Sequence, residues 1–309
     1  MERVFPDYYQ NFRCIADACR HNCCIGWEID IDPDTLAFYD TLPGALGERL
    51  KRNIARGGEP HFILGEGERC PFLNDKYLCD LIIELGEESI CGICTEHPRF
   101  HNALPGRVES GIGFCCEAAG RLILGRSEPV RLIVTGEAEG PDEIVALRDE
   151  ALVLLQDREK SIPARIEALL ALCGGSLGQR SMGEWAEQFL ALERLDEAWT
   201  KRLKQLRDGW QSADLAGFDR HMAERESEYE QLLVYFVYRH LSNAVDEADM
   251  AARSAFAALG YTVLHTMGAL LWQEKGVFSF DDQVELARLF SSEIEYSDEN
   301  LDILLDELC

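Results

Sequence analysis

The chain has 309 residues, of which 47% are hydrophobic, so it is long enough for two domains or one large domain with a substantial core. Its net charge is −26, of which −8 lies up to Val130 and −18 beyond it. A field of this sign repels nucleic acid phosphates and anionic membranes and attracts cations such as lysine side chains, so neither nucleic acid nor a membrane is an expected partner. Taken alone, the charge can equally serve only to keep the protein in solution.

The first residues carry no apolar stretch of the kind that a secretory signal needs. The longest apolar runs, such as residues 232–238, are too short to span a bilayer. We therefore expect a cytoplasmic protein, in which thiols stay reduced and structural disulfides are rare.

Ten of the twelve cysteines lie within the first 116 residues, and they are clustered: Cys14, Cys19, Cys23, Cys24, Cys70, Cys79, Cys91, Cys94, Cys115 and Cys116. Such a density indicates either disulfides or a metal site. The expected reducing compartment favours metal, and so do the adjacent Cys23 and Cys24, because a vicinal disulfide is strained. Cys173 and Cys309 stand alone and fit ordinary free cysteines.

The spacing of the cysteines does not identify the metal. A zinc ribbon needs two C-x2-C knuckles, and only Cys91 to Cys94 has that spacing. The ferredoxin run C-x2-C-x2-C-x3-C-P is absent, and so is C-x3-C-x2-C. We expect ligands from several segments, because four thiolates suit either tetrahedral zinc or one cubane cluster. A second metal, a redox pair or spare thiols remain open for the other cysteines.

The two parts of the chain differ in their proline content. Eight of the ten prolines precede residue 130, which predicts short elements and loops around the thiols. Beyond it the sequence predicts helices over residues 164–172, after Ser181 with Glu184 as a capping box, over 219–240, and over 249–275 as one helix or two meeting near Gly260. Asp282 and Ser297 are expected to cap two more, ending at Phe290 and Leu308.

These patterns predict a mainly α protein. An irregular, cysteine-rich, metal-binding N-terminal domain (1–135) is followed by an all-helical C-terminal domain (136–309), with the boundary in residues 135–141. The pair Gly111 and Gly113 is only a fragment of a glycine-rich nucleotide loop, and no alternation of strands and helices follows it. The chain is therefore not expected to be a doubly wound methyltransferase.

Several segments resemble the flagellin lysine-N-methylase family, within a wider group of cysteine-cluster proteins that chelate iron or zinc. They are residues 12–27, 70–79, 85–99, 109–124, 238–241 and 292–297, which include Cys70-Pro71-Phe72-Leu73 and Tyr238-Arg239-His240-Leu241. The resemblance implies methyl transfer from S-adenosylmethionine to lysine side chains of flagellin or a similar surface protein, with a [4Fe–4S] cluster. The helical domain would recognise the protein substrate. The matched segments make Cys14, Cys19, Cys23, Cys24, Cys70, Cys79, Cys94 and Cys115 the candidate metal ligands.

Lysine methylation also requires a neutral amine and a site for a sulfonium, which aromatic rings and carboxylates can line. The candidate catalytic residues are Glu117, His97, Tyr235 and Tyr238, and the candidate cofactor-binding residues are Arg99, Glu109 and Arg121. Each has a plainer interpretation: aromatic residues at helical spacing usually form core, His97 precedes a proline in a turn, and Glu117 can pair with Arg121 along a helix.

Two other functions fit the same sequence. One is a zinc-stabilised protein-binding module without enzymatic activity, and the other is a redox or metal-handling protein.

Overall fold

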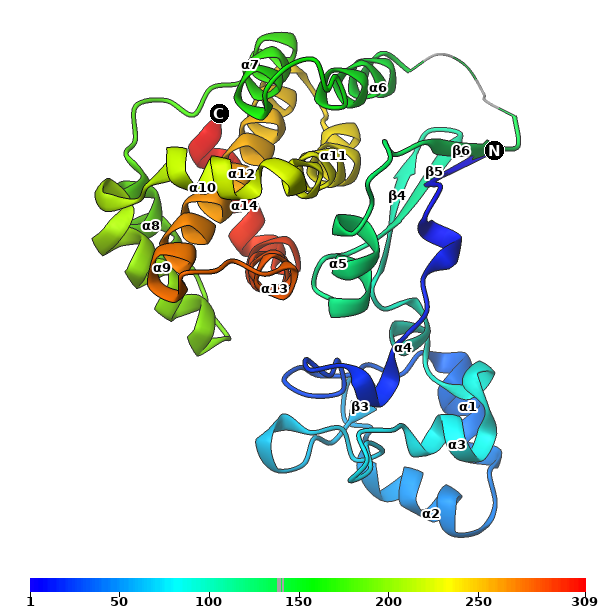
Figure 1. Cartoon of the computed structure of the whole chain (residues 1–309). Coiled ribbons are helices and arrows are strands. Elements are labelled where there is room, and N and C mark those ends of the chain that lie inside the picture. Colours follow the sequence, from blue (N-terminus) through cyan, green and yellow to red (C-terminus); the bar gives the residue numbers. More distant parts are fainter. Residues whose placement is uncertain (138–139, 141) are drawn as a thin grey trace. The chain divides into compact units, whose positions relative to one another are not determined.

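The computed structural model describes residues 1–137, 140 and 142–309, and the chain forms two compact units. Arg13–Phe100 form one unit, which we call the insert unit. Met1–Phe12 and His101–Cys309 together form the other, which we call the main unit. Helices predominate, so the prediction of a mainly helical protein is confirmed (Figure 1).

The main unit contains a four-stranded sheet in the order β4–β5–β1–β6. Its strands are β1 (Glu2–Pro6), β4 (Arg99–Leu104), β5 (Arg107–Ile112) and β6 (Leu132–Thr135). β1 runs parallel to β5, with Val4 opposite Glu109, and antiparallel to β6. This sheet was not predicted, because its central pairing joins segments far apart in sequence, whereas periodicity reports local structure.

Ten α-helices of the main unit follow or flank this sheet in the described part of the chain. They are α5 (Glu117–Leu124), α6 (Glu143–Leu155), α7 (Ile162–Cys173), α8 (Met182–Ala191), α9 (Glu197–Gly209), α10 (Leu215–Met222), α11 (Glu226–His240), α12 (Glu247–Lys275), α13 (Phe280–Phe290) and α14 (Asp298–Leu308). A π-helical segment, Ser291–Glu295, follows α13 directly and precedes α14. Helix α5, which begins directly after Cys116, packs on α11 and α13. The segment that follows β5 is therefore in contact with the helices of the main unit.

Helix α12 forms the core of the main unit and contacts α7, α9, α11, α13 and α14 (Figure 1). The sequence left open whether residues 249–275 form one helix or two. They form one, because Gly260 does not interrupt α12. A Cβ atom at Gly260 would lie 2.8 Å from Cε2 of Phe236, so this glycine lets α11 approach closely. Within the described residues, α12 is the one helix long and apolar enough to cross a membrane, and 83% of its most apolar window is buried inside the protein.

The predicted helix boundaries are largely confirmed. Helix α7 begins after Ser161, and Ser181 with Glu184 forms the expected capping box of α8. Ser297 caps α14. Two predictions are corrected: the N-cap of α13 is Ser279, with Asp282 as its capping-box partner, and residues 219–240 form two helices, because a 3₁₀ turn at Ala223–Arg225 separates them.

The insert unit consists of short elements, as its proline and glycine content predicts. These are α1 (Pro33–Thr41), α2 (Gly44–Asn53), β2 (Ile54–Ala55), β3 (His61–Phe62), α3 (Asp80–Leu85) and α4 (Gly92–Glu96). Its apolar core includes Tyr39, Phe62 and Phe72. The Asp32 side chain caps α1 and also accepts a hydrogen bond from the N–H of Gly92 at 2.8 Å, so it links α1 to α4.

The compact units do not coincide with the predicted domains 1–135 and 136–309. Residues 1–12 and 101–135 belong with the helices, because β1, β5 and β6 form one sheet and α5 packs on α11 and α13. The predicted boundary falls partly on residues 138, 139 and 141, which lie outside the described residues.

Candidate functional site

Five cysteines of the insert unit form a thiol cluster: Cys24, Cys70, Cys79, Cys91 and Cys94. Cys70 and Cys91 are buried in the apolar core, and the other three pack against it. The N–H of Cys70 donates to the carbonyl of Cys24 at 2.8 Å, which pairs these two segments. The sulfur atoms of Cys91 and Cys94 are 3.3 Å apart, one at the N-cap of α4 and the other within it. The fold thus gathers thiols from four separate segments.

The electrostatics of the thiol cluster follow from this crowding. Burial raises the pKa of Cys70 to about 11. The pKa of Cys94 is raised by its hydrogen bond with Cys91, then by burial, and further by charge on Cys24 and Cys70. Cys24 is affected in the same way, with its hydrogen bond to Cys23 as the largest cause of a raised pKa. Burial and neighbouring thiols therefore raise the pKa of Cys24, Cys70 and Cys94, whereas the hydrogen bond with Cys94 lowers the pKa of Cys91. A bound cation would favour the thiolate form of all four.

In residues 1–137, 140 and 142–309, no group of three or more His, Cys, Asp or Glu side chains has the arrangement of a metal site as it stands. The donor set nonetheless fits a thiophilic metal, because the cluster offers five thiols.

The predicted metal ligands are distributed between the units. Cys24, Cys70, Cys79 and Cys94 lie in the thiol cluster, and the thiol of Cys23 is hydrogen-bonded to Cys24. Cys14 and Cys19 lie on the first loop of the insert unit, where the sulfur of Cys14 accepts from the N–H of Ala16 and that of Cys19 donates to the carbonyl of His21. Cys115 belongs to the main unit.

Cys91 is in the thiol cluster but is not in the predicted ligand set. Its C-x2-C spacing with Cys94 was the signal that could have included it.

A second polar site is buried in the main unit around Arg239, on α11. A guanidinium nitrogen of Arg239 donates to the Tyr235 hydroxyl at 2.7 Å, and that hydroxyl donates to Glu295 at 3.1 Å. His240 Nε2 lies 2.6 Å from the other oxygen of Glu295. Glu295 is presented by the π-helical segment, a form often found at functional positions. We call Tyr235, Arg239, His240, Glu295, Tyr296 and Cys115 the Arg239 cluster.

The Arg239 cluster reaches the surface at Tyr296. The Arg239 guanidinium lies 4.6 Å from the centre of the Tyr296 ring, and the Tyr296 hydroxyl is hydrogen-bonded to the Cys115 thiol. Burial raises the pKa of Cys115 to about 12. Burial also opposes ionisation of Glu295, but the charge of Arg239 and the hydrogen bond from His240 hold its pKa below its usual value. The cluster is therefore an ionised Arg–Glu pair with a neutral thiol and neutral hydroxyls.

Glu109 and Tyr238 lie in a second ion-pair network of the main unit. Glu109 is fully buried and accepts two hydrogen bonds of 2.6 Å from Arg148 on α6, a third from Arg107, and a fourth from Ser242. The Tyr238 hydroxyl lies 3.1 Å from the carbonyl of Val4 and 3.0 Å from that of Ser110. These contacts hold the sheet against α6 and α11.

The remaining candidates lie at three further positions. Glu117 is buried and bonds Arg121, which also bonds Asp281 on α13 at 2.7 Å. His97 is half-buried in the insert unit, where burial lowers its pKa to about 4. Arg99 donates to the carbonyl of Thr95 at 3.0 Å. The predicted cofactor-binding residues thus have different partners: Arg148 and Arg107 for Glu109, Glu117 and Asp281 for Arg121, and the Thr95 carbonyl for Arg99.

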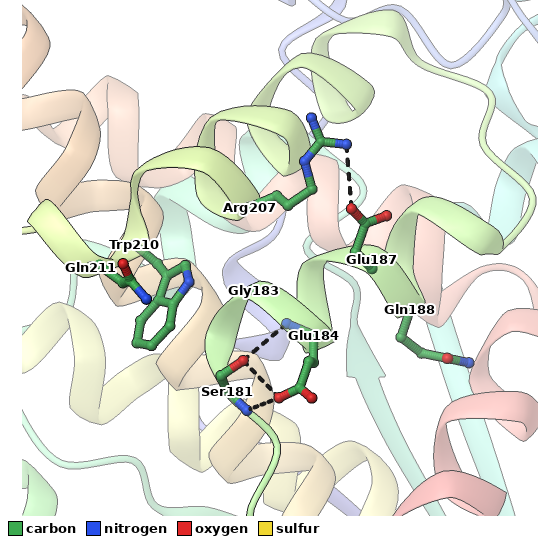
Figure 2. A pocket seen from close by; sticks show the side chains of 8 residues that line it. All are labelled: Ser181, Gly183, Glu184, Glu187, Gln188, Arg207, Trp210 and Gln211. Carbon is green, nitrogen blue, oxygen red and sulfur yellow. Dashed lines mark hydrogen bonds and ion pairs between the residues drawn. The ribbon is translucent and has the colours of Figure 1, made fainter.

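Two hollows mark the surface of the helical part. One, of about 510 Å³, lies between α8 and the end of α9 and is lined by Ser181, Gly183, Glu184, Glu187, Gln188, Arg207, Trp210 and Gln211 (Figure 2). The other, of about 470 Å³, is lined by charged residues that include Arg158, Arg165 and Glu230.

Residues 176–308 match the family model described as the FliB lysine N-methylase C-terminal domain. The predicted resemblance to the flagellin lysine-N-methylase family is confirmed. This matched region runs from the start of α8 to α14 and contains most of the Arg239 cluster and the 510 Å³ groove.

Curated relatives agree with this match. Lysine-N-methylases of Salmonella choleraesuis and Salmonella typhimurium are each 28% identical over 135 residues, which cover 41% of this chain and 33% of the relative. The flagellar biosynthetic protein FliU of Salmonella muenchen is 27% identical over 135 residues, 41% of this chain and 79% of its own length. The alignment thus spans only about a third of the two lysine-N-methylases. No solved structure matches.

Proposed function

We propose that this protein is a protein-lysine N-methyltransferase. It transfers a methyl group from S-adenosylmethionine to lysine side chains of flagellin or a similar surface protein, and its insert unit holds a cysteine-ligated [4Fe–4S] cluster. The observation that carries the proposal is the match of residues 176–308 to the lysine N-methylase C-terminal domain.

The thiol cluster supports the metal part of the proposal. Cys24, Cys70, Cys79, Cys91 and Cys94 supply five thiols for the four protein ligands that a cubane cluster takes at most. A cluster held by three of these thiols would keep one iron without a protein ligand, and that iron would supply a site for S-adenosylmethionine. Two of the five thiols would then remain outside the ligand set.

The transfer itself makes two demands on the chain. The lone pair of the lysine nitrogen attacks the methyl carbon, a C–N bond forms, and the C–S bond breaks with its electrons going to sulfur, which gives S-adenosylhomocysteine. The nitrogen must first lose a proton, since the free amine has a pKa of about 10.4. The negative charge of the chain concentrates lysine side chains, and desolvation of the bound amine would lower its pKa.

The same thiol cluster favours a second candidate, a zinc-stabilised binding module, because four thiolates also satisfy tetrahedral zinc. Anaerobic purification with metal analysis separates the two. Brown protein with iron and sulfide supports the methyltransferase, whereas colourless protein with stoichiometric zinc supports the binding module.

Mass spectrometry of flagellin tests the reaction. Methyl additions on flagellin lysines are expected in cells that carry this gene and not in cells that lack it. If flagellin is made normally and its lysine pattern does not depend on the gene, lysine methylation of flagellin is not the function.

Variants test the ligands. Cys70→Ser and Cys91→Ser should each lose metal, because both thiols are buried in the thiol cluster. Cys173→Ala combined with Cys309→Ala is the matched control, since both cysteines lie in the main unit away from other cysteines in sequence. Full metal content in both serine variants would remove the thiol cluster from the proposal.

A further inference from the structure

The groove between α8 and α9 has no part in the thiol cluster or the Arg239 cluster. It is open to solvent, and its walls are the first two turns of α8, the end of α9 and the short 3₁₀ turn Trp210–Ser212 (Figure 2). Its chemistry is an indole, carboxylates and side-chain amides rather than an apolar core.

Gly183 shapes the groove. It is the second residue of α8, and a Cβ atom there would lie 2.7 Å from Nε1 of Trp210 and 3.3 Å from its Cδ1. The absence of a side chain lets the indole edge lie against the helix backbone. Glycine within a helix costs about 0.5–1 kcal/mol relative to alanine, so the sequence keeps a destabilising residue where it gives the indole room.

The charge of the groove is negative. The Oε1 atom of Glu187 lies 3.4 Å from Nη1 of Arg207 (Figure 2). Arg207 also donates through Nε and Nη2 to Asp208 at 2.7 and 3.2 Å, so this guanidinium is already paired with two carboxylates. Glu184 is the additional carboxylate. Its Oε2 accepts hydrogen bonds from the N–H and the hydroxyl of Ser181 at 2.8 and 2.7 Å (Figure 2), and the side chain is exposed.

An indole and an ionised carboxylate that line the same groove suit an alkylammonium group. The aliphatic stem of a lysine can lie along the ring of Trp210 while its ammonium reaches the Glu184 carboxylate. An anionic side chain does not fit, because Glu184 and Glu187 both line the groove and the groove-lining guanidinium of Arg207 is already paired with Glu187 and Asp208.

We propose that this groove binds a lysine side chain of the protein partner, with Trp210 and Glu184 as the recognition residues. It acts as a docking site that holds the partner, not as the place of the reaction. The inference rests on the proposed function only for the identity of the partner, a lysine-bearing surface protein.

Binding can be measured on the full chain labelled with 5-fluorotryptophan. The five tryptophans give separate fluorine resonances, and Trp210→Phe identifies the one from the groove. Titration with Nα-acetyl-lysine methylamide should shift that resonance, and added salt should weaken the effect. The neutral Nα-acetyl-glutamine methylamide should not shift it. Equal shifts with both probes, or none with the lysine probe, would overturn the proposal.

Two variants localise the effect. Glu184→Gln keeps the capping box, because glutamine also serves at that position, and should raise the dissociation constant about two- to fivefold. Glu167→Gln, an exposed glutamate on α7, makes the same charge change outside the groove and should leave the constant unchanged. Gly183→Ala should displace the Trp210 resonance without ligand and abolish the further shift. An equal loss in the two glutamate variants would show a nonspecific charge effect and contradict the groove.

The two proposals fail separately. If the lysine probe shifts Trp210 but flagellin carries no gene-dependent methyl groups, the groove stands and the reaction does not. If methylation occurs, Glu184→Gln should raise the KM for the protein substrate and leave kcat unchanged. An unchanged KM would assign docking elsewhere.

Discussion

Arg148 and Glu109 form the most deeply buried ion pair described in the main unit, with both side chains at 0% exposure. Removing Arg148 takes away two of the four hydrogen bonds to the buried Glu109 carboxylate and leaves Arg107 as its charged partner in a low-dielectric site. Arg148→Met should therefore reduce the free energy of unfolding by up to about 3–5 kcal/mol in denaturant titration.

The control for that substitution is Lys160→Ala, which removes an exposed pair with Asp157 at 2.9 Å and should change stability little. Comparable losses in the two variants would mean that burial does not set the strength of the Glu109 pair.

His240 makes stability depend on pH. Burial lowers its pKa against the opposing hydrogen bond to Glu295, and Arg239 and Arg253 also disfavour its charged form. Burial lowers the pKa of His265 in the same way, although Asp219 opposes it. Because the unfolded chain takes up these protons near pH 6.5 and the folded chain does not, stability is complete above about pH 6.5 and falls as the pH drops below it.

Urea titrations at about pH 5.5 and about pH 7 should show this slope, at most about 1.4 kcal/mol per pH unit for each histidine. The double variant His240→Gln with His265→Gln should have a smaller slope. The same slope in the variant would assign it to other groups.

At the scale of single residues, the sequence could name candidate side chains but not the partners that they have in the fold. Tyr235 and Tyr238 were predicted as candidates, but their hydroxyls are bonded within the fold. The partners are Glu295 and the carbonyls of Val4 and Ser110, which are distant in sequence and leave no local pattern.

Helix ends were predictable because capping is a contact between residues three apart. Ser181 with Glu184 needs only local geometry. The prediction of Asp282 as the N-cap of α13 was wrong by three residues. Ser279 is the N-cap, and Asp282 is its partner in the capping box. Ser279→Ala should reduce the free energy of unfolding by about 1 kcal/mol, measured by thermal or chemical denaturation. Ser176→Ala, in the loop before α8, is the control and should cost less.

Gly260 tests the packing of α12 on α11. Alanine favours helix over glycine by about 1 kcal/mol, yet a Cβ here would meet the Phe236 ring at 2.8 Å. We expect overpacking to prevail, so Gly260→Ala should destabilise the protein by about 1–3 kcal/mol. A more stable variant would show that the two helices separate at little cost.

At the scale of the whole molecule, the sequence predicted a cysteine-rich region and a helical region. It did not predict that the cysteine-rich region is inserted within the other unit. A boundary at one point assumes that each domain is a continuous segment. Here Met1–Phe12 pairs through β1 with β5 and β6, so the cysteine-rich Arg13–Phe100 lies between two parts of one unit. Only a long-range strand pairing reveals such an insertion, and single-sequence periodicity does not report it.

The insertion predicts that metal removal acts on one unit. The insert unit has short helices and a small core built around Cys70 and Cys91, so metal bonding should supply much of its folding free energy, on the order of 10 kcal/mol. The main unit has its own core around α12 and should remain folded. Tryptophan separates the two, because Trp27 is the one tryptophan of the insert unit and its indole N–H donates to the carbonyl of Cys23 at 2.5 Å.

In the 5-fluorotryptophan protein, chelation should therefore collapse the Trp27 resonance towards its unfolded position and leave the resonances of Trp185, Trp199, Trp210 and Trp272 in place. Cys91→Ser should give the same spectrum without chelator, since Cys91 is buried in the thiol cluster. If the main-unit resonances collapse together with that of Trp27, the two units fold as one. If all five resonances stay unchanged while metal analysis confirms that the metal has left, the insert unit folds without it, and the thiol cluster is not what stabilises that unit.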